Sequence, residues 1–518
     1  MATVSLGRRI AQSTGIVMAS VLASRLLGFF REWTVAHQVG SNAVTDSYYA
    51  AISLPDFLNY LVAAGSLSLT FIPVFAQYVA EDREEEGWRV FSTVICVMGL
   101  ALVALVALAE ILAPELAALI APGFGPAQKA RLIFLTRLML PAQICFYLGG
   151  ILSAVQYAKG QFVVPSLAPL IYNTGVILGG VFLSPKIGIT GFAVGVLAGA
   201  MAGNFLLQVY GSRRAGARFR PNFEFRHPGF RLFLKLAIPI MLALSLSFTD
   251  DWIVRWFASY LQPASITWLS YSKTLMRVPL GVVGQAVGVA SFPFLAQLYS
   301  QKKFEELNRT LNTTLKGLTL LLVPVSALTI AQSSPLVYLV FSHTRLRGPD
   351  FEATASTLAL FSVGMFAWGA QNILARGFYA TQDTLTPAVV GTAITFLNLP
   401  VYWLLVRREQ HLGLATASSL GIIVYTVPLF VLLNRSTANR EAGSLLVFFA
   451  KIAIASAVGA LACFELLTWL ETRIAWRTTH GAFAVLVVAS LAGLMVTAAL
   501  GKLLRVRELD TYLKKLRS

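Results

Sequence analysis

Long apolar stretches recur along the whole chain. Each contains about 20 or more mostly apolar residues, which is the length that an α-helix needs to cross the hydrocarbon core of a bilayer. Strands and soluble core helices are usually shorter. The pattern predicts an all-α integral membrane protein with about fourteen transmembrane helices. The predicted helices lie at 12–38, 44–79, 90–119, 132–157, 163–184, 188–212, 231–257, 266–299, 311–340, 354–379, 385–406, 412–434, 445–470 and 481–503.

The composition supports a membrane protein. The chain has 518 residues, of which 56% are hydrophobic and 13% are charged, and its mean hydropathy is +0.70. A soluble domain usually carries about 25% charged residues. A chain this long and this apolar cannot bury its hydrophobic surface in one soluble core, so the bilayer is the expected solvent.

The basic residues orient the predicted helices. If the N-terminus is cytoplasmic, the cytoplasmic loops hold roughly 25 Lys and Arg residues against roughly 9 outside, which is the bias of the positive-inside rule. An odd number of helices would spoil this pattern. We therefore expect both termini to be cytoplasmic, and we interpret the net charge of +17 as topology. Nucleic-acid binding is not expected, because the basic residues are spread over many loops.

The chain carries no pattern typical of a metal or cofactor enzyme. Cys96, Cys145 and Cys463 lie in apolar stretches without metal-ligand spacing, and the five histidines are scattered. There is no phosphate-binding P-loop and no nucleophile elbow. We expect no bound metal and no cofactor. Coupling to the membrane potential or to a Na⁺ or H⁺ gradient is possible for a transporter of this kind.

Two sequence matches at nearly one offset indicate an internal repeat. The chain reads PVFAQ at 73–77 and PFLAQ at 293–297. A Tyr-Ala pair precedes a proline by eight positions at 157–165 and again at 379–387. The offset in residue number differs by only two positions between the two matches. The matches predict a duplicated unit of six helices, followed by two appended helices.

A polar, basic segment after residue 212 is the longest predicted cytoplasmic linker, and it suggests two lobes. Both repeats start on the same side, so they are parallel, and transporters built this way bind substrate between rocking lobes. We therefore expect two six-helix lobes around a central cavity. The predicted parts are an N-lobe at 1–212, a linker at 213–230, a C-lobe at 231–434 and a C-terminal helix pair with a basic tail at 435–518.

Four basic residues inside apolar stretches are candidates for substrate binding. A charge at the membrane midplane is costly, so it usually faces a wet cavity or a partner. Arg25 and Arg31 lie in the first stretch, and Lys273 and Arg277 lie four residues apart in the eighth. Together they would form an electropositive cavity suited to a phosphate or pyrophosphate. The competing interpretation is internal salt bridging with nearby acids.

Acidic and amide side chains are candidates for supporting the cavity or for coupling. Asp250 and Asp251 could form a cation or proton site, and Asn398 could add a ligand. Pairing with the cavity arginines is an equally good explanation of the two acids. Glu32 and Asp46 lie in the first two stretches. The C-terminal pair of helices, which is nearly free of charge, could form a groove for a lipid tail or simply pack against lipid.

Several motifs resemble those of the lipid II flippase family, MurJ (also called MviN), within the superfamily of multidrug and polysaccharide-lipid exporters. SRLLGFFRE at 24–32 is close to S-R-x-L-G-x-x-R-[DE], and the stretch from Gly65 to Pro73 is similar to G-x-x-x-x-x-F-[VI]-P. APGF at 121–124 matches a periplasmic motif, and 165–173 resembles P-x-L-A-P-x-x-x-N. GFYATQDTLTP at 377–387 matches the F-Y-A-x-x-D-T-x-T-P signature.

The resemblance implies a flippase that moves lipid II, the lipid-linked peptidoglycan precursor, from the inner to the outer leaflet of the bacterial cytoplasmic membrane. Arg25, Arg31 and Asp46 fall on matching functional positions, and cavity arginines would meet the pyrophosphate. The chain departs from the family at two positions. Asn59 stands where a basic residue is usual, and Thr274, which follows Lys273 in this chain, stands where an arginine is usual. We expect a monomer whose partners are lipid II and membrane lipids, and the cell-wall synthesis machinery is a further candidate partner.

Four other functions compete with this prediction. A flippase for another polyprenyl-pyrophosphate glycan would use the same basic cavity. A cation-coupled multidrug exporter would prefer an acidic or apolar cavity. A membrane enzyme acting on polyprenyl-phosphate sugars would need a catalytic carboxylate or histidine with a partner, or a large extramembrane domain, and no loop exceeds roughly 20 residues between predicted spans. A non-transporting scaffold would tolerate loss of the cavity arginines.

Overall fold

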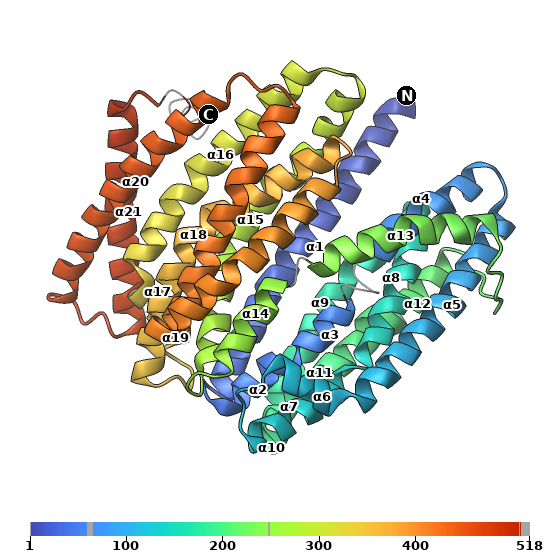
Figure 1. The fold of residues 1–518 in the computed structure, drawn as a ribbon, viewed down its shortest axis with the longest axis horizontal. Coiled ribbons are helices and arrows are strands. Elements are labelled where there is room, and N and C mark those ends of the chain that lie inside the picture. Colours follow the sequence, from blue (N-terminus) through green and yellow to red (C-terminus); the bar gives the residue numbers. More distant parts are fainter. Residues whose placement is uncertain (1, 60–65, 247–248, 507, 509–518) are drawn as a thin grey trace. The chain divides into compact units, whose positions relative to one another are not determined.

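The computed structural model describes residues 2–59, 66–246, 249–506 and 508, and over these residues its regular structure is entirely helical (Figure 1). The chain divides into two compact units, residues 1–266 and residues 267–518, which we describe separately. Gly65 of the second-helix motif and residues 509–518 of the basic tail lie outside the described residues.

Unit 1 holds fourteen α-helices and two short π-helical segments, at 179–183 and 200–206, in its described part. The helices are α1 (Ala2–Gln38), α2 (Ala43–Ala51), α3 (Ser53–Leu58), α4 (Ser66–Ala80), α5 (Glu84–Ile111), α6 (Ala113–Ile120), α7 (Pro126–Met139), α8 (Ala142–Ala158), α9 (Val163–Leu178), α10 (Ser184–Ile187), α11 (Thr190–Gly199), α12 (Leu207–Arg214), α13 (Pro228–Leu246) and α14 (Thr249–Ala258).

Unit 2 holds longer helices. They are α15 (Ser265–Ser300, whose first two residues belong to unit 1), α16 (Phe304–Ala331), α17 (Ser333–Phe341), α18 (Gly348–Ala380), α19 (Leu385–Ser436), α20 (Ala442–Glu471) and α21 (Thr479–Leu503).

Every predicted transmembrane stretch coincides with one helix or with a broken helix. The stretch 44–79 contains α2, α3 and α4, and the stretch 231–257 contains α13 and α14. The stretches 385–406 and 412–434 both lie in α19, which is broken at Gln410, where φ is 52°. Among the described residues, nine helical segments are long and apolar enough to cross a membrane. The predicted all-α, multi-span fold class is confirmed.

Turns with a left-handed residue recur at the offset of the sequence repeat. Asp82 and Lys302 both have positive φ, an uncommon conformation outside glycine, and their offset equals that of the PVFAQ and PFLAQ motifs. In both turns the following N–H donates, over 2.9 Å, to the carbonyl five residues earlier. This equivalence supports the duplication. At the offset of the two Tyr-Ala pairs, positive φ also pairs Gly160 with Gln382, Gly188 with Gln410 and Gly216 with Ala438.

The packing of the helices and the sequence duplication place residues 231–266 in different halves of the chain. The duplication places α13 and α14 in the second repeat, but α13 packs against α4 and α5, and α14 packs against α6. Both helices therefore belong to unit 1. The lobe and linker boundaries given by the sequence stay a prediction.

Glycines allow α9 to approach α11 and the π-helical segment that follows it. A Cβ on Gly199 would lie 2.6 Å from the carbonyl oxygen of Tyr172, and a Cβ on Gly195 would lie 2.7 Å from that of Gly175. No real Cβ tolerates such distances, so these positions require glycine. Small residues at helix crossings are typical of membrane proteins, where close van der Waals packing drives association.

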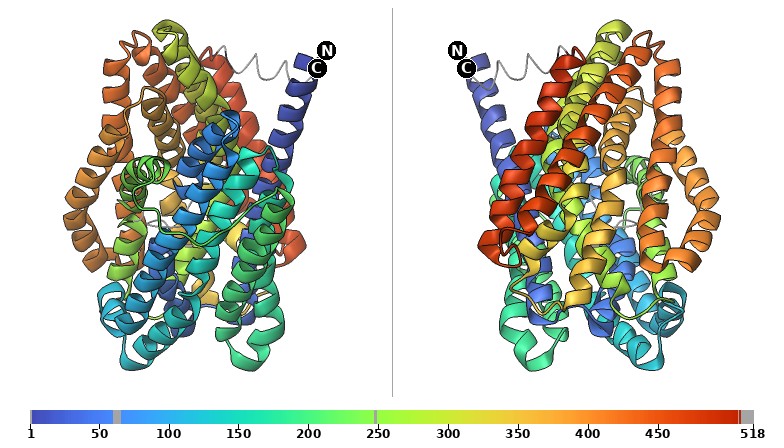
Figure 2. Two further views of the ribbon diagram at one scale, coloured as in Figure 1. Left: turned by 90° about the vertical axis from the view of Figure 1, so that its right-hand side faces the viewer. Right: turned by 90° about the vertical axis from the view of Figure 1, so that its left-hand side faces the viewer.

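The two C-terminal helices, α20 and α21, pack side by side (Figure 2, red) and against α16. They cross closely at Gly459, where a Cβ would lie 2.6 Å from the carbonyl oxygen of Gly493. Cys463 lies in a buried apolar cluster with Leu328 and Leu467. The thiol therefore packs in the core of this helix group. The groove for a lipid tail that the sequence suggested stays a prediction.

Candidate functional site

Arg31 and Glu32, near the C-terminal end of α1, form an ion pair. Arg31 Nη2 lies 2.7 Å and Nε 3.1 Å from Glu32 Oε1. The Tyr49 hydroxyl, on α2, donates to the other oxygen of the same carboxylate. Glu32 is buried with 8% of its surface exposed, so a lone carboxylate there would be costly. Arg31 and Tyr49 offset this cost, and the carboxylate in turn holds the Arg31 guanidinium in one orientation.

Asn173, on α9, is the second partner of Arg31. Its Oδ1 accepts a hydrogen bond from Arg31 Nη1 at 3.3 Å. Its Nδ2 donates to the carbonyl oxygens of Pro169 at 3.0 Å and Ser24 at 3.4 Å, and to Ser24 Oγ at 3.3 Å. The amide therefore links α9 to two turns of α1. Asn173 was not among the predicted site residues, although the motif at 165–173 contains it.

Arg25 lies on the same helix, half-buried, six residues before Arg31. At about 100° per residue the two arginines point roughly 120° apart around the helix axis. Arg25 and Glu32, seven residues apart, share a face instead. The joint use of Arg25 and Arg31 on one ligand therefore depends on their long, flexible side chains, and it stays a prediction.

Asp46, in the first turn of α2, binds main chain. Its Oδ2 accepts a hydrogen bond from the Ala264 N–H at 2.7 Å, and the residue is 2% exposed. Ala264 has a φ of 83°, which is strained for any residue with a Cβ. A charge-assisted bond at this point stabilises the turn that leads into α15. The preceding Thr45 completes the capping box of α2 with Asn42.

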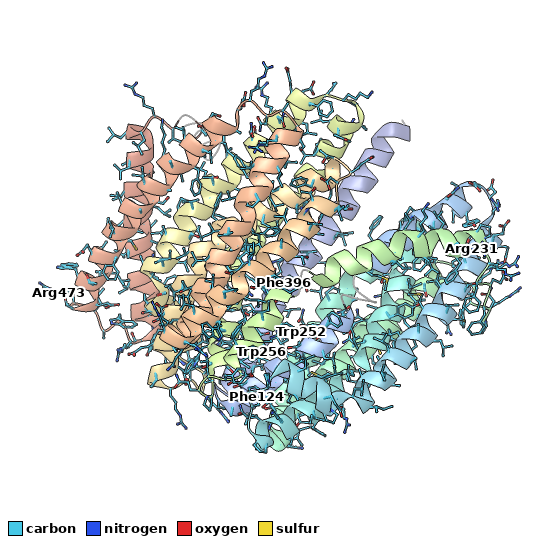
Figure 3. All side chains as sticks on the ribbon, in the orientation of Figure 1. Phe124, Arg231, Trp252, Trp256, Phe396 and Arg473 are labelled. Carbon is cyan, nitrogen blue, oxygen red and sulfur yellow. The ribbon has the colours of Figure 1, made fainter. Side chains whose placement is uncertain are left out.

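Asp250 and Asp251 occupy the first turn of α14 and are half-buried. Acidic side chains are favoured there by the positive end of the helix dipole. The same helix is fixed to α3, because Arg255 Nη1 donates to Ser53 Oγ at 2.7 Å and Trp252 stacks on Phe57 with ring centroids 5.1 Å apart. Figure 3 labels Trp252 and Trp256 on this helix. The predicted cation site at the two aspartates is untested.

Lys273, on α15 in unit 2, lies against aromatic rings of α18. Its Nζ is 5.7 Å from the ring centroid of Phe361 and 6.0 Å from that of Trp368. Such cation–π contacts stabilise an ammonium group away from bulk water. Arg277, one turn later, is exposed on the surface of the unit. The neighbouring Lys273 and Arg277 therefore have different surroundings, which the sequence did not distinguish.

Asn398 joins the two halves of α19. Its Nδ2 donates to the Ala417 carbonyl at 3.0 Å, and a Cβ on Gly421 would lie 2.5 Å from that nitrogen. The amide therefore has a packing role across the break in the helix. Its predicted role as a ligand for a coupling cation stays a prediction.

Two of the motifs have structural explanations. In the motif 377–387, Asp383 accepts hydrogen bonds from Thr386 N at 2.9 Å and Thr386 Oγ1 at 2.6 Å, which fixes the start of α19. In the motif 121–124, Gly123 donates its N–H to Ser259 Oγ at 3.1 Å, and a Cβ there would lie 2.5 Å from the Ser259 carbonyl oxygen. These contacts fix the start of a helix in one motif and a close approach of main chain in the other.

The predicted site residues are divided between the units. Arg31 and Glu32 are in contact within unit 1, which also holds Arg25, Asp46, Asp250 and Asp251, and unit 2 holds Lys273, Arg277 and Asn398. The convergence of both groups on one cavity stays a prediction. In the described part of the chain, no cluster of three or more His, Cys, Asp or Glu side chains has a geometry suited to a metal ion.

Comparison with known proteins identifies the family. The family model described as lipid II flippase MurJ matches residues 35–487. The chain belongs to this family. It is 28% identical, over 97% of both chains, to a probable lipid II flippase MurJ of Vibrio cholerae serotype O1. It is 25% identical to the lipid II flippase MurJ of Burkholderia cenocepacia, over 89% of this chain and 90% of the relative. The family predicted from the motifs is confirmed.

Solved structures share the fold. A lipid II flippase MurJ in an inward closed conformation matches with a TM-score of 0.78 and 22% identity, over 95% of this chain and 99% of that chain. An inward-facing multidrug resistance transporter of the MATE family matches with a TM-score of 0.61 and 16% identity, over 80% and 94%. The MurJ family is one of flippases, so the prediction of a transporter in place of an enzyme is confirmed.

Proposed function

We propose that this protein is a lipid II flippase that moves the precursor from the inner to the outer leaflet of the bacterial cytoplasmic membrane by alternating access. The match of the flippase family model over residues 35–487 carries the proposal. The relatives named above are described as flippases or probable flippases of lipid II, and they cover nearly the whole chain. The helical fold with many membrane spans fits a transporter that moves a lipid across the membrane.

Arg31 is the best-supported contact for the pyrophosphate of the substrate. Its guanidinium is oriented by Glu32 and Asn173, and an arginine keeps its charge when water is excluded. Two phosphate oxygens can accept parallel N–H donors from one guanidinium. In this proposal Arg25, Lys273 and Arg277 supply the remaining positive charge. Glu32 and Asp46 keep the surrounding helices in place.

Energy for transport comes, in this proposal, from the membrane potential or from a Na⁺ or H⁺ gradient. Asp250, Asp251 and Asn398 are the candidate coupling residues. The protein acts as a monomer with both termini in the cytoplasm, and it could supply substrate to the cell-wall synthesis machinery.

A flippase for another polyprenyl-pyrophosphate glycan is the second candidate. Asn59 and Thr274 stand where basic residues are usual in the family, and Lys273 carries the positive charge of that part of α15. A positive charge at position 273 in place of 274 would suit a headgroup of different shape. The shared pyrophosphate chemistry explains why the same arginines would serve both substrates.

The test is lipid II exposure at the outer leaflet of cells depleted of their own lipid II flippase. Wild type should restore exposure and growth, and Arg31→Ala and Arg25→Ala should not. Arg309→Ala, at an exposed arginine near the start of α16, is the matched control and should behave as wild type. A well-inserted wild type that restores neither would contradict the lipid II assignment. Other polyprenyl-linked glycans would then be assayed in the same way.

A further inference from the structure

The basic linker of unit 1 is fixed to the flank of α5. We call residues 213–231 the linker strap; it comprises the last two residues of α12, the segment between the helices and the first turn of α13. Arg89 of α5 binds the Glu224 carboxylate through Nη2 at 2.8 Å and Nε at 3.0 Å. The Arg220 N–H donates to Ser92 Oγ at 3.1 Å. These bonds hold the part of the strap between the two helices, residues 215–227, against α5, and this part has no helix of its own.

The strap keeps a large excess of positive charge after this pairing. It contains six arginines and one glutamate, and the glutamate is used by Arg89. Arg218 pairs with Glu85. In the described part of unit 1 no carboxylate forms an ion pair with the other arginines of the strap, which are Arg213, Arg214, Arg220, Arg226 and Arg231.

Exposed aromatic rings lie among these arginines. Phe219, Phe223 and Phe225 are 50%, 53% and 57% exposed. Phe223 stacks on Phe225, and Phe225 meets the buried Phe230 edge to face, each pair with centroids 6.4 Å apart. The rings therefore continue from the surface into the core of the unit. Clustered exposed rings are typical of a surface that contacts a protein partner or a membrane.

The register of the strap on α5 places it at the level of a membrane interface. It binds α5 at Arg89, Ser92 and Thr93, immediately before the long apolar run of that helix begins at residue 94. The strap also starts where one membrane segment ends and stops where the next begins. Figure 3 shows Arg231 at the end of unit 1 opposite to Phe124 and Trp256. Aromatic and basic side chains together are typical of the headgroup region.

We propose that the linker strap is a binding surface for anionic phospholipids of the surrounding leaflet. The phenylalanines enter the headgroup region, and Arg213, Arg214, Arg220 and Arg226 bind lipid phosphates and the negative surface potential. Charge and aromatic content both favour a lipid surface over a soluble acidic protein. The strap belongs to the cytoplasmic side in the predicted topology, and the lipid site is independent of the transported substrate.

A local fluorescence measurement tests the proposal. The full chain, with Cys96, Cys145 and Cys463 replaced by alanine and Phe223→Cys labelled with bimane, is reconstituted in liposomes without lipid II. The liposomes contain equal amounts of phosphatidylglycerol and phosphatidylcholine, and one of the two is brominated. The expected result is quenching by both brominated lipids, stronger with phosphatidylglycerol. Phe219→Cys is the alternative label position if the first variant folds poorly.

Charge removal provides the control. Arg220→Gln with Arg226→Gln should lower the preference for phosphatidylglycerol at the label by about fivefold for each arginine. Lys302→Gln with Arg309→Gln removes equal charge from unit 2 and should leave the preference unchanged. Equal loss in both variants would overturn a local site. Efficient quenching by aqueous iodide without quenching by lipid would show a water-exposed strap, and it would favour a protein partner.

Discussion

The Arg31 side chain shows how a membrane protein keeps a cation in place for an anionic ligand. Its guanidinium has one charged partner, Glu32, and one neutral partner, Asn173. The charged partner offsets the cost of burial, and the neutral partner directs Nη1 without cancelling more of the charge. The Tyr49 hydroxyl also donates to the Glu32 carboxylate, so Arg31 shares this anion with a second donor and keeps part of its positive charge for a ligand.

Asn173→Ala should weaken apparent lipid II affinity by about tenfold to a hundredfold while the protein still inserts and folds. The reason is the lost hydrogen bond to a charged group, which contributes about 1.5–3 kcal/mol. The measurement is lipid II flipping in proteoliposomes as a function of lipid II content, together with thermal unfolding. Asn173→Asp keeps an acceptor for Nη1 but adds a second carboxylate beside Arg31 and loses the Nδ2 donor, so it should recover no affinity relative to alanine. Equal affinity in wild type and Asn173→Ala would contradict a positioning role.

Lys273→Gln should reduce flipping, because it removes one of the two basic side chains, Lys273 and Arg277, that this part of α15 offers to the substrate. Restoring charge one position later, in Lys273→Gln with Thr274→Arg, should recover part of the activity. The complementation assay in flippase-depleted cells measures both variants. If Lys273→Gln supports full growth, this ammonium group does not meet the substrate. Recovery by the double variant with an altered glycan preference would favour a shifted headgroup contact.

At the scale of elements, glycines and caps decide how the helices meet. The approach of α9 to the helix at 190–206 uses positions where a Cβ would collide with main-chain oxygen. Main chain cannot move as easily as a flexible side chain, so the helices themselves would have to separate. The start of α19 depends on one aspartate that replaces the missing main-chain acceptor.

Gly199→Val should destabilise the protein by about 1–3 kcal/mol, the usual cost of overpacking. The reason is the 2.6 Å distance from its Cβ to the Tyr172 carbonyl oxygen. Thermal unfolding of the purified protein measures the loss. Gly443→Ala is the matched control, because nothing lies within 4 Å of its Cβ, and it should be neutral or slightly stabilising. A neutral Gly199→Val would show that the helix contact is looser than described.

Asp383→Ala should lower stability by about 1 kcal/mol through loss of the cap, without changing the flipping rate of the folded fraction. Asp383→Ser should be milder, since a serine hydroxyl also caps. Yield, thermal unfolding and flipping per folded molecule separate the two effects. A loss of flipping at full stability would instead assign Asp383 a direct role in transport.

At the scale of the whole molecule, the duplication explains the regular placement of left-handed turns. Four pairs of positive-φ residues recur at the two offsets of the sequence repeat, and each pair ends equivalent helices. The identities differ within pairs, for example Gly188 and Gln410, so the backbone conformation has been kept where the sequence has changed.

Reporter fusions should place both termini and the strap in the cytoplasm and the segment 121–124 outside. The reason is the excess of Lys and Arg in alternate loops. Alkaline phosphatase, active only outside, should be inactive when fused after Arg214 or Ser518 and active when fused after Phe124. A fusion after Lys302 serves as a second cytoplasmic control. Activity after Ser518 would mean an odd number of crossings and would overturn the predicted topology.

The sequence by itself determined the class of the protein, its fourteen apolar stretches, the repeat and the family. Each of these depends on local features, namely the length of an apolar run, the sign of loop charge and short motifs, which need no knowledge of distant contacts. Even the break of α19 at Gln410 lay between two predicted helices.

Only the tertiary structure decided what individual polar residues do. Asn173 meets Arg31 across 142 residues of chain, and Asp46 meets Ala264 across 218. A hydrogen-bond partner depends on which helix faces are brought together, and side-chain packing sets this, not local composition. For the same reason, the most closely matching sequence motif, at 377–387, contains a side chain that caps a helix. The sequence did not predict Asn173 on α9 as a partner of Arg31.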